Sequence, residues 1–232
     1  MIRRDTRDGL PANMLNGGAN EKLEGRIKDY YRHVENYDWT RAADNFVGPE
    51  TLFHRVRCRE ILRLLKSISS PPRKWLDVGC GTALITRRLP VGTVGLDLNP
   101  RNLEKAKRYA PQAAFINCDA EGHIPLTDQS FDFAVCTEML EHLMHPRRAI
   151  AEIHRVLKPA GVLVGSVPGR SPIWKLRGLS NSQSSFAEEP YHMHYRRGEV
   201  QSLLSERLRV RRLYSKHLQM NWFFVAIKER QS

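Results

Sequence analysis

A short apolar run that ends in two closely spaced glycines constrains this chain more than any other feature. Residues 75–83 read Trp-Leu-Asp-Val-Gly-Cys-Gly-Thr-Ala; the apolar part predicts a buried strand, and a helical pattern starts at Leu84. Strand, glycine turn and helix in this order are typical of the first unit of a doubly wound sheet. Gly79 and Gly81 would let a ligand touch the backbone, and the helix would point its free N–H groups at that ligand. We therefore expect a ligand site at this turn.

Strands and helices alternate after the turn. This rhythm predicts an α/β fold, a Rossmann-like doubly wound sheet that is mostly parallel and ends in an antiparallel hairpin. Asn99 and Pro100 are typical of an N-cap and first helical position, and Pro146 opens a second amphipathic helix. The expected strands cover 93–97, 113–118, 131–136 and 162–167, a helix covers 197–207, and the hairpin covers 209–214 and 219–227.

The segments outside this core predict additions to a single domain over 21–232. Residues 1–20 are polar and are expected to be a disordered tail, and helices over 21–35 and 50–68 form an N-terminal layer within 21–70. Residues 169–195 are expected to cap the substrate pocket. Two alternatives stay open for the aromatic cluster of the N-terminal layer. It packs against the sheet, or it forms a lid from which His54, Arg55 or Arg57 reaches a ligand carboxylate; the cluster is Tyr30, Tyr31, His33, Tyr37 and Trp39.

Acidic residues follow successive strands. Asp97 lies 20 residues after Asp77, a spacing at which a carboxylate can accept both ribose hydroxyls of a nucleoside. Asp119 ends the third strand, where a polar group could accept from an adenine amino group, and Glu138 follows the fourth. Because ligands of such sheets bind beyond the carboxyl ends of the strands, one pocket can collect these side chains.

Composition limits the possible partners. The net charge of +12 favours an anionic partner such as nucleic acid, but the basic residues are scattered without interleaved aromatic residues, which disfavours nucleic acid without excluding it. The four cysteines have neither metal spacing nor a disulfide pattern. With no secretory signal and no transmembrane segment recognisable, a cytoplasmic monomer or homodimer is expected.

Four ordered motifs resemble those of class I S-adenosylmethionine-dependent methyltransferases. They are 76–82 (Leu-Asp-Val-Gly-Cys-Gly-Thr), 95–97 (Gly-Leu-Asp), 118–120 (Cys-Asp-Ala) and 155–159 (Arg-Val-Leu-Lys-Pro). Leu140-Glu141-His142-Leu143 is similar to a motif of the ubiquinone and menaquinone biosynthesis subgroup. The resemblance covers about residues 74–168. Ala83 and Ala160 depart from it, since each stands where the family usually has glycine.

The resemblance implies S-adenosyl-L-methionine as the cofactor and a role for each matching residue. The backbone of Gly79, Cys80 and Gly81 would pass under the methionine part. Asp77 would orient that loop, and Asp97 with Leu98 would hold the ribose. Asp119 and Ala120 would bracket the adenine, and Thr137 or Glu138 would sit near the sulfonium.

Other chemistries fit the residues less well. A nicotinamide dehydrogenase would need a third glycine where Leu84 stands. Metal sites are suggested by Glu141-His142 with His145 and by His192-Met193-His194, but neither has an obvious third ligand, so no metal is expected. Methyltransferases that modify RNA or protein would carry motifs that are absent here. They remain an alternative, as does a non-catalytic cofactor-binding partner protein.

The sulfonium is already activated, so the enzyme mainly aligns the methyl donor and the acceptor. An oxygen or carbon acceptor can also need a base, and histidine is the natural choice near neutral pH. His142 is the first candidate, and Glu138 and His192 follow; His142 could equally be a packed residue at a helix start. Apolar residues of the expected cap favour a small, hydrophobic or lipid-like acceptor that is methylated on oxygen, carbon or nitrogen.

Overall fold

The computed structural model describes residues 17–34, 38–45, 48–68, 73–172, 191–216 and 218–230. Seven strands form one sheet in the order β3-β2-β1-β4-β5-β7-β6, parallel except for β7, which runs antiparallel to both neighbours. This confirms the expected α/β fold with its terminal hairpin. The strands are β1 (Trp75–Val78), β2 (Val94–Asp97), β3 (Ala114–Asn117), β4 (Phe131–Thr137), β5 (Leu157–Pro168), β6 (Arg209–Lys216) and β7 (Asn221–Ile227).

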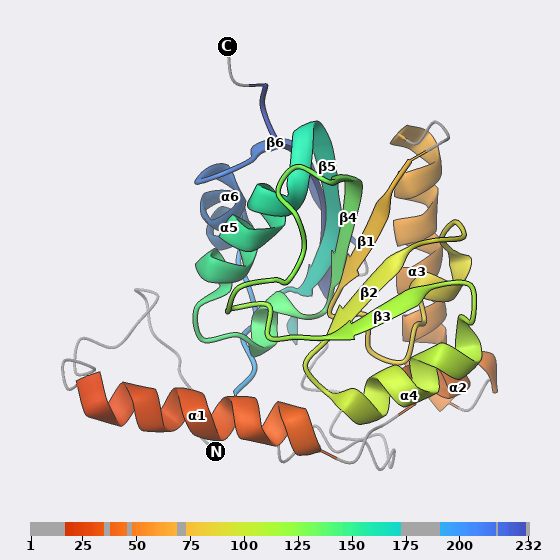
Figure 1. The fold of residues 1–232 in the computed structure, drawn as a ribbon, viewed down its shortest axis with the longest axis horizontal. Helices are drawn as coiled ribbons and strands as arrows, with labels where there is room; N and C mark the ends of the chain where they lie inside the picture. Colours follow the sequence, from red (N-terminus) through yellow and green to blue (C-terminus); the bar gives the residue numbers. More distant parts are fainter. Residues whose placement is uncertain are drawn as a thin grey trace.

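Helices cover both faces and one end of the sheet (Figure 1). α3 lies on one face, α5 and α6 lie on the other, and α1 lies across the end of the sheet where the parallel strands finish. The helices are α1 (Gly17–His33), α2 (Trp39–Asp44), α3 (Gly48–Ile68), α4 (Pro100–Tyr109), α5 (Pro146–Val156) and α6 (Arg197–Ser205), with short 3-10 turns η1 (Thr86–Arg88) and η2 (Leu140–His142).

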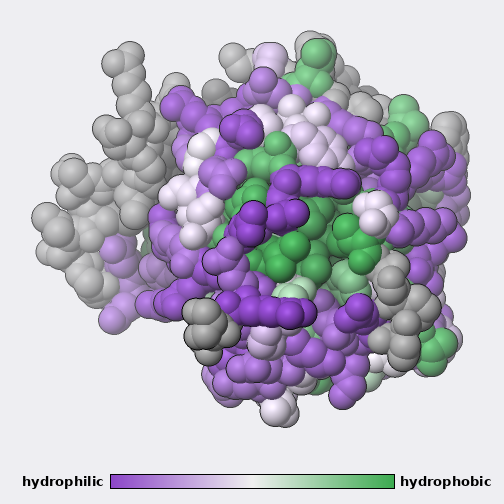
Figure 2. Space-filling view, turned by 90° about the horizontal axis from the view of Figure 1, so that it is seen from above, coloured by the Kyte–Doolittle hydropathy of each residue, from purple (hydrophilic) through white to green (hydrophobic). Residues whose placement is uncertain are grey.

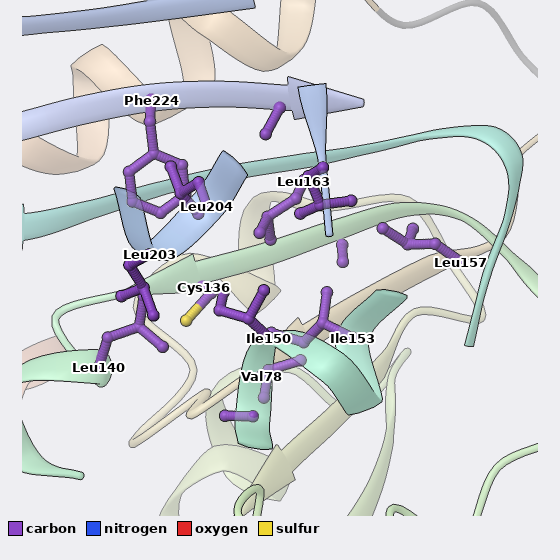
Figure 3. Close-up of a cluster of buried hydrophobic side chains, with 14 of the residues drawn as sticks. Val78, Cys136, Leu140, Ile150, Ile153, Leu157, Leu163, Leu203, Leu204 and Phe224 are labelled. Carbon is purple, nitrogen blue, oxygen red and sulfur yellow. The ribbon is translucent and has the colours of Figure 1, made fainter. Parts of the chain in front are cut away.

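Alternate residues of the central strands enter two different cores. Ala134, Cys136 and Phe224 pack with α5 and α6, whereas Phe133 and Val135 pack with α3. This period of two places every second side chain on the same face, and both faces are apolar because helices cover both. Figure 3 shows the larger core, in which Ile150 and Ile153 of α5 and Leu203 and Leu204 of α6 meet the strands.

The side of the molecule remote from α1 is mostly hydrophilic, with polar side chains around a limited hydrophobic area (Figure 2). Within the described residues, no helix is both long enough and apolar enough to cross a membrane.

The boundaries of several expected elements shift. Residues 17–20 belong to α1 instead of the expected tail, whose residues 1–16 lie outside the described residues together with 173–190 of the expected cap. α2 was not expected. The segment Lys158–Gly161 was expected to precede the fifth strand, but β5 starts at Leu157 and contains an irregularity in its pairing with β4. Asn99 caps α4 as expected, since its side chain accepts from Arg101 N.

Candidate active site

A cavity lies between the carboxyl ends of β1, β2 and β4 and the N-terminal helices. Because it gathers side chains from several strand ends, its position is the one expected for a doubly wound sheet. Every residue that the sequence analysis assigned to the cofactor or to catalysis lines it: Asp77, Gly79, Cys80, Gly81, Asp97, Leu98, Asp119, Ala120, Thr137, Glu138, His142 and His192.

The glycine loop turns sharply after β1. The amides of Gly79 and Cys80 both donate to the Leu96 carbonyl at 2.8 Å, which ties the loop to β2. Gly79 has φ +72°, and a Cβ built on it would lie 2.4 Å from Cγ of Met139. Gly81 also has a positive φ, of +53°. Both positions therefore favour glycine, by conformation at each and by close approach at Gly79.

The helix expected from Leu84 is wrong, because turns and the three-residue η1 follow the loop. Ala83 adopts φ +66°, a left-handed conformation that interrupts a right-handed helix. Pro90 follows after a single turn, and a proline cannot continue the helical hydrogen bonds. A ligand on the loop would therefore meet the backbone of the loop itself and not the positive end of a helix.

Asp77 is buried beneath the loop at 1% exposure. Its Oδ2 accepts from the Thr86 hydroxyl at 2.6 Å, while its Oδ1 has no hydrogen-bond partner among the described residues. Burial raises the pKa of Asp77 to about 7, and the negative charge of Asp97 adds to the shift. Loss of water destabilises the charged form of a carboxyl group, so Asp77 titrates near neutrality.

Asp97 is held at the end of β2 by three donors. Oδ2 accepts from Gly81 N at 2.9 Å, and Oδ1 accepts from Asn99 N at 2.9 Å and from Asn102 Nδ2 at 3.0 Å. Burial raises the pKa of this carboxyl group, and the three hydrogen bonds counteract the rise. Asp97 thus connects the glycine loop to the start of α4, with its carboxylate plane fixed.

Asp119, after β3, meets a lysine from α1. Its Oδ2 lies 2.9 Å from Lys28 Nζ, which also contacts Glu24 at 2.7 Å and Glu121 at 3.3 Å. Although burial alone lowers the pKa of Lys28, its hydrogen bonds with Glu24 and Asp119 raise it above its usual value. The lysine therefore stays charged and holds α1 over this end of the cavity.

Glu138, after β4, lies among donors from three elements. Its Oε1 accepts from Ser166 Oγ at 2.8 Å and from Asn221 Nδ2 at 2.9 Å, and its Oε2 lies 3.3 Å from Arg57 Nη1. Glu138 itself adopts φ +50°. Ser166 and Asn221 are buried polar residues in otherwise apolar strands, which is the one sequence signal that could have indicated their role.

His142, in η2, contacts both α1 and the 191–195 segment. Its Nδ1 lies 2.9 Å from Tyr31 Oη, and its ring meets that of His192 edge to face with centroids 5.0 Å apart. Burial, and secondarily the charge of His192, lowers the pKa of His142 to about 3. A hydrogen bond with the Tyr191 backbone opposes this shift, and the ring is neutral at neutral pH.

The N-terminal layer forms the roof of the cavity. Tyr30, Tyr31 and Trp39 of the aromatic cluster line it, as do His54 and Arg57, whereas His33 does not; Tyr37 lies outside the described residues. Arg55 points elsewhere and donates to the carbonyls of Ala43 and Asp44. No sequence signal indicated Lys28, because pairing of α1 with the strand ends is a long-range contact.

Comparisons with known proteins point to one class. Residues 76–165 match the family described as "Methyltransferase domain". The ubiquinone biosynthesis O-methyltransferase of Vibrio atlanticus is 33% identical over 106 residues, which cover 43% of this chain and 45% of that protein. The malonyl-[acyl-carrier protein] O-methyltransferase of Hamiltonella defensa is 29% identical over 157 residues, covering 66% and 58%. The chain thus spans only part of the length of these curated relatives.

The fold is also similar to that of solved methyltransferase structures. The magnesium protoporphyrin IX methyltransferase of Synechocystis, solved with bound SAH, superposes with a TM-score of 0.68 at 14% identity, covering 88% of this chain and 99% of that one. Such a likeness shows the fold. The matched domain shows that residues 76–165 are similar to S-adenosylmethionine-dependent methyltransferases. Both of these curated relatives are named as O-methyltransferases.

Proposed function

We propose that this chain transfers a methyl group from S-adenosyl-L-methionine to a small molecule bound in the same cavity. One observation carries the proposal: residues from the ends of four strands, each with its own expected role toward the cofactor, line one cavity. Methionine would lie on the Gly79–Gly81 loop, ribose at Asp97 and adenine beside Asp119 and Ala120. The bound SAH of the Synechocystis protein supports this choice of cofactor.

The charges of the cavity suit a sulfonium. Acidic side chains outnumber the basic Lys28 and Arg57 among the residues that line it, and an excess of carboxylates in a site shielded from water attracts a cation. The acidic residues include Glu24, Asp97, Asp119, Glu121, Glu138 and Glu141. Methyl transfer would convert the sulfonium of a bound cofactor into an uncharged thioether. The demethylated product is therefore attracted less than the cofactor, which favours its release after transfer.

At the acceptor end, we assign a proton-accepting role to His142. A neutral ring can take a hydrogen bond from an acceptor O–H or N–H and receive its proton as the new bond to the methyl carbon forms. Glu141 Oε1 lies 3.8 Å from His142 Nε2 and would stabilise the imidazolium. Glu138 is engaged by Ser166 and Asn221, so its part is to orient the groups around the sulfonium. His192 borders the same space.

The acceptor is a small molecule with an apolar body in this proposal. Ile27, Val34, Phe53, Met139 and Leu143 contribute apolar surface to the cavity, which would exclude water and leave few competing polar groups. The curated relatives named as O-methyltransferases support an oxygen as the methylated atom.

Calorimetric titration with S-adenosyl-L-methionine and, separately, with NAD tests the cofactor assignment. Wild-type protein should bind the sulfonium and not NAD, and Asp97→Ala should weaken binding roughly tenfold or more, as expected for loss of a hydrogen-bonded charge. Asp128→Ala changes a carboxylate that is 68% exposed and lies outside the cavity-lining set, and it should bind like wild type. Folded wild-type protein that fails to bind S-adenosyl-L-methionine would overturn the proposal.

A further inference from the structure

Tyr31 makes two contacts that converge on the proposed proton acceptor. Its hydroxyl oxygen lies 2.9 Å from His142 Nδ1 and 2.6 Å from the Tyr191 carbonyl oxygen. The two rings are also in contact, with centroids 4.9 Å apart and planes inclined by 53°. Tyr31 belongs to α1, His142 to η2 and Tyr191 to the 191–195 segment, so three distant parts of the chain meet at one hydroxyl group.

Counting protons at this hydroxyl fixes the tautomer of the histidine. A phenol has a single proton to donate, and a backbone carbonyl can only accept. The short contact with Tyr191 O therefore takes the Tyr31 proton. The Tyr31 oxygen must then accept from His142, so Nδ1 carries the ring proton. The neutral ring has only one N–H, and Nε2 is left as the unprotonated nitrogen.

The surroundings of Nε2 fit a nitrogen that receives a proton. Glu141 Oε1, at 3.8 Å, is beyond hydrogen-bond distance yet close enough to stabilise a positive charge on the ring. The Glu141 side chain is 1% exposed, and His142 lines the cavity. With Nδ1 held by Tyr31, the opposite edge of the ring is the one available to a bound acceptor.

We propose that Tyr31 is a positioning residue that holds His142 in the Nδ1–H tautomer, so that Nε2 can receive the proton of the methyl acceptor. This inference rests on the proposed function, since it gives His142 its part in methyl transfer. It assigns to α1 a role beyond covering the cavity, because only a placed α1 brings the hydroxyl to the ring.

Nitrogen-15 NMR of protein labelled at its histidines tests the proposal without any knowledge of the acceptor. The signals of His142 are identified by their loss in His142→Gln, and spectra are recorded with and without S-adenosylhomocysteine. Wild type should show a protonated Nδ1 and an unprotonated Nε2. Tyr31→Phe should lose this single-tautomer pattern, whereas Tyr30→Phe, which removes a hydroxyl group from the neighbouring residue of α1, should retain it.

Two results would overturn the inference: an Nε2–H tautomer in wild type, or a Tyr31→Phe spectrum at His142 that superposes on that of wild type. Calorimetry on the same samples keeps the two proposals distinct. If Tyr31→Phe binds S-adenosyl-L-methionine like wild type but keeps the wild-type pattern at His142, only the role of Tyr31 fails. If no sample binds the cofactor, the proposed function fails, and with it the catalytic role of the tautomer.

Discussion

The buried carboxyl group of Asp77 makes a strong prediction about stability and pH. Its folded-state pKa of about 7 compares with an ordinary value of 3.8. A difference of this size corresponds to about 4 kcal/mol of unfolding free energy, at roughly 1.4 kcal/mol per pH unit. Because the folded state holds the proton more tightly than the unfolded state, the stabilising contribution is complete below pH 4 and is lost as the pH rises toward 7.

Asp77→Asn removes this titration while its amide oxygen can still accept from Thr86. We expect the variant to become increasingly more stable than wild type as the pH rises from 4 to 7. Above pH 7, the difference in unfolding free energy between the variant and wild type should approach about 4 kcal/mol. The cost of burying an amide N–H group without a partner, about 1–3 kcal/mol, is subtracted from this value. Urea unfolding followed by circular dichroism at half-unit pH steps from 4 to 8 measures the gap directly.

Asp132→Asn is a control of opposite sign. Burial alone would raise the pKa of Asp132, but hydrogen bonds from Lys74 N and Lys158 lower it below its usual value. This variant should be less stable than wild type at pH 7, and the deficit should shrink as the pH falls through the folded-state pKa. Stability curves for wild type and Asp77→Asn that run parallel from pH 4 to pH 8 would refute the argument for Asp77.

Three further predictions concern a hydrogen-bonded carboxylate, the packing at a glycine and a left-handed backbone position, and urea midpoints test each. Glu60 accepts from Tyr214 and Lys216 and has a pKa lowered to about 2. Glu60→Gln should therefore cost about 1–3 kcal/mol at pH 7 and less as the pH falls through about 2, where wild type loses the same charge. Gly165→Ala should destabilise the protein by about 3 kcal/mol or more, because the new Cβ would lie 2.1 Å from the Cys136 carbonyl oxygen. By contrast, a Cβ at Gly25 in α1 would meet nothing within 4 Å, so Gly25→Ala should stabilise the protein by about 0.5–1 kcal/mol. Ala160 has φ +64°, so Ala160→Gly should stabilise by about 0.5–1 kcal/mol, and a loss of stability would contradict the strain.

Much of the fold follows from local pattern. Continuous apolar runs such as residues 133–136 (Phe-Ala-Val-Cys) predict strands that are buried on both faces, and their alternation with amphipathic helices predicts the parallel sheet. The cavity lining follows from topology as well, since polar residues placed just after parallel strands must share one edge; Asp97 and Asp119 are examples. Ala83 and Ala160, the two departures from the family pattern, both adopt a positive φ, so the resemblance also located these left-handed positions.

The parts that could not be predicted depend on contacts between distant residues. The helix expected after the glycine loop fails because Ala83 is left-handed, and its conformation depends on how the loop is tied to β2 and to α2. The three donors to Glu138 come from β5, β7 and α3. Neither periodicity nor composition brings such residues together. The placement of α1 could not be predicted for the same reason, since nothing within its sequence indicates which acidic groups Lys28 contacts.

The attachments of α1 connect it to the proposed cofactor site through shared side chains. Asn99 donates from its side chain to the carbonyls of Tyr31 and Val34 in or just after α1, while its backbone N–H donates to Asp97. Lys28 contacts Asp119. A ligand that engages Asp97 and Asp119 would therefore act on the same groups that hold α1 over the cavity. Cofactor affinity and the placement of α1 are then linked, so a substitution at Lys28 should alter cofactor affinity even if Lys28 never touches the cofactor.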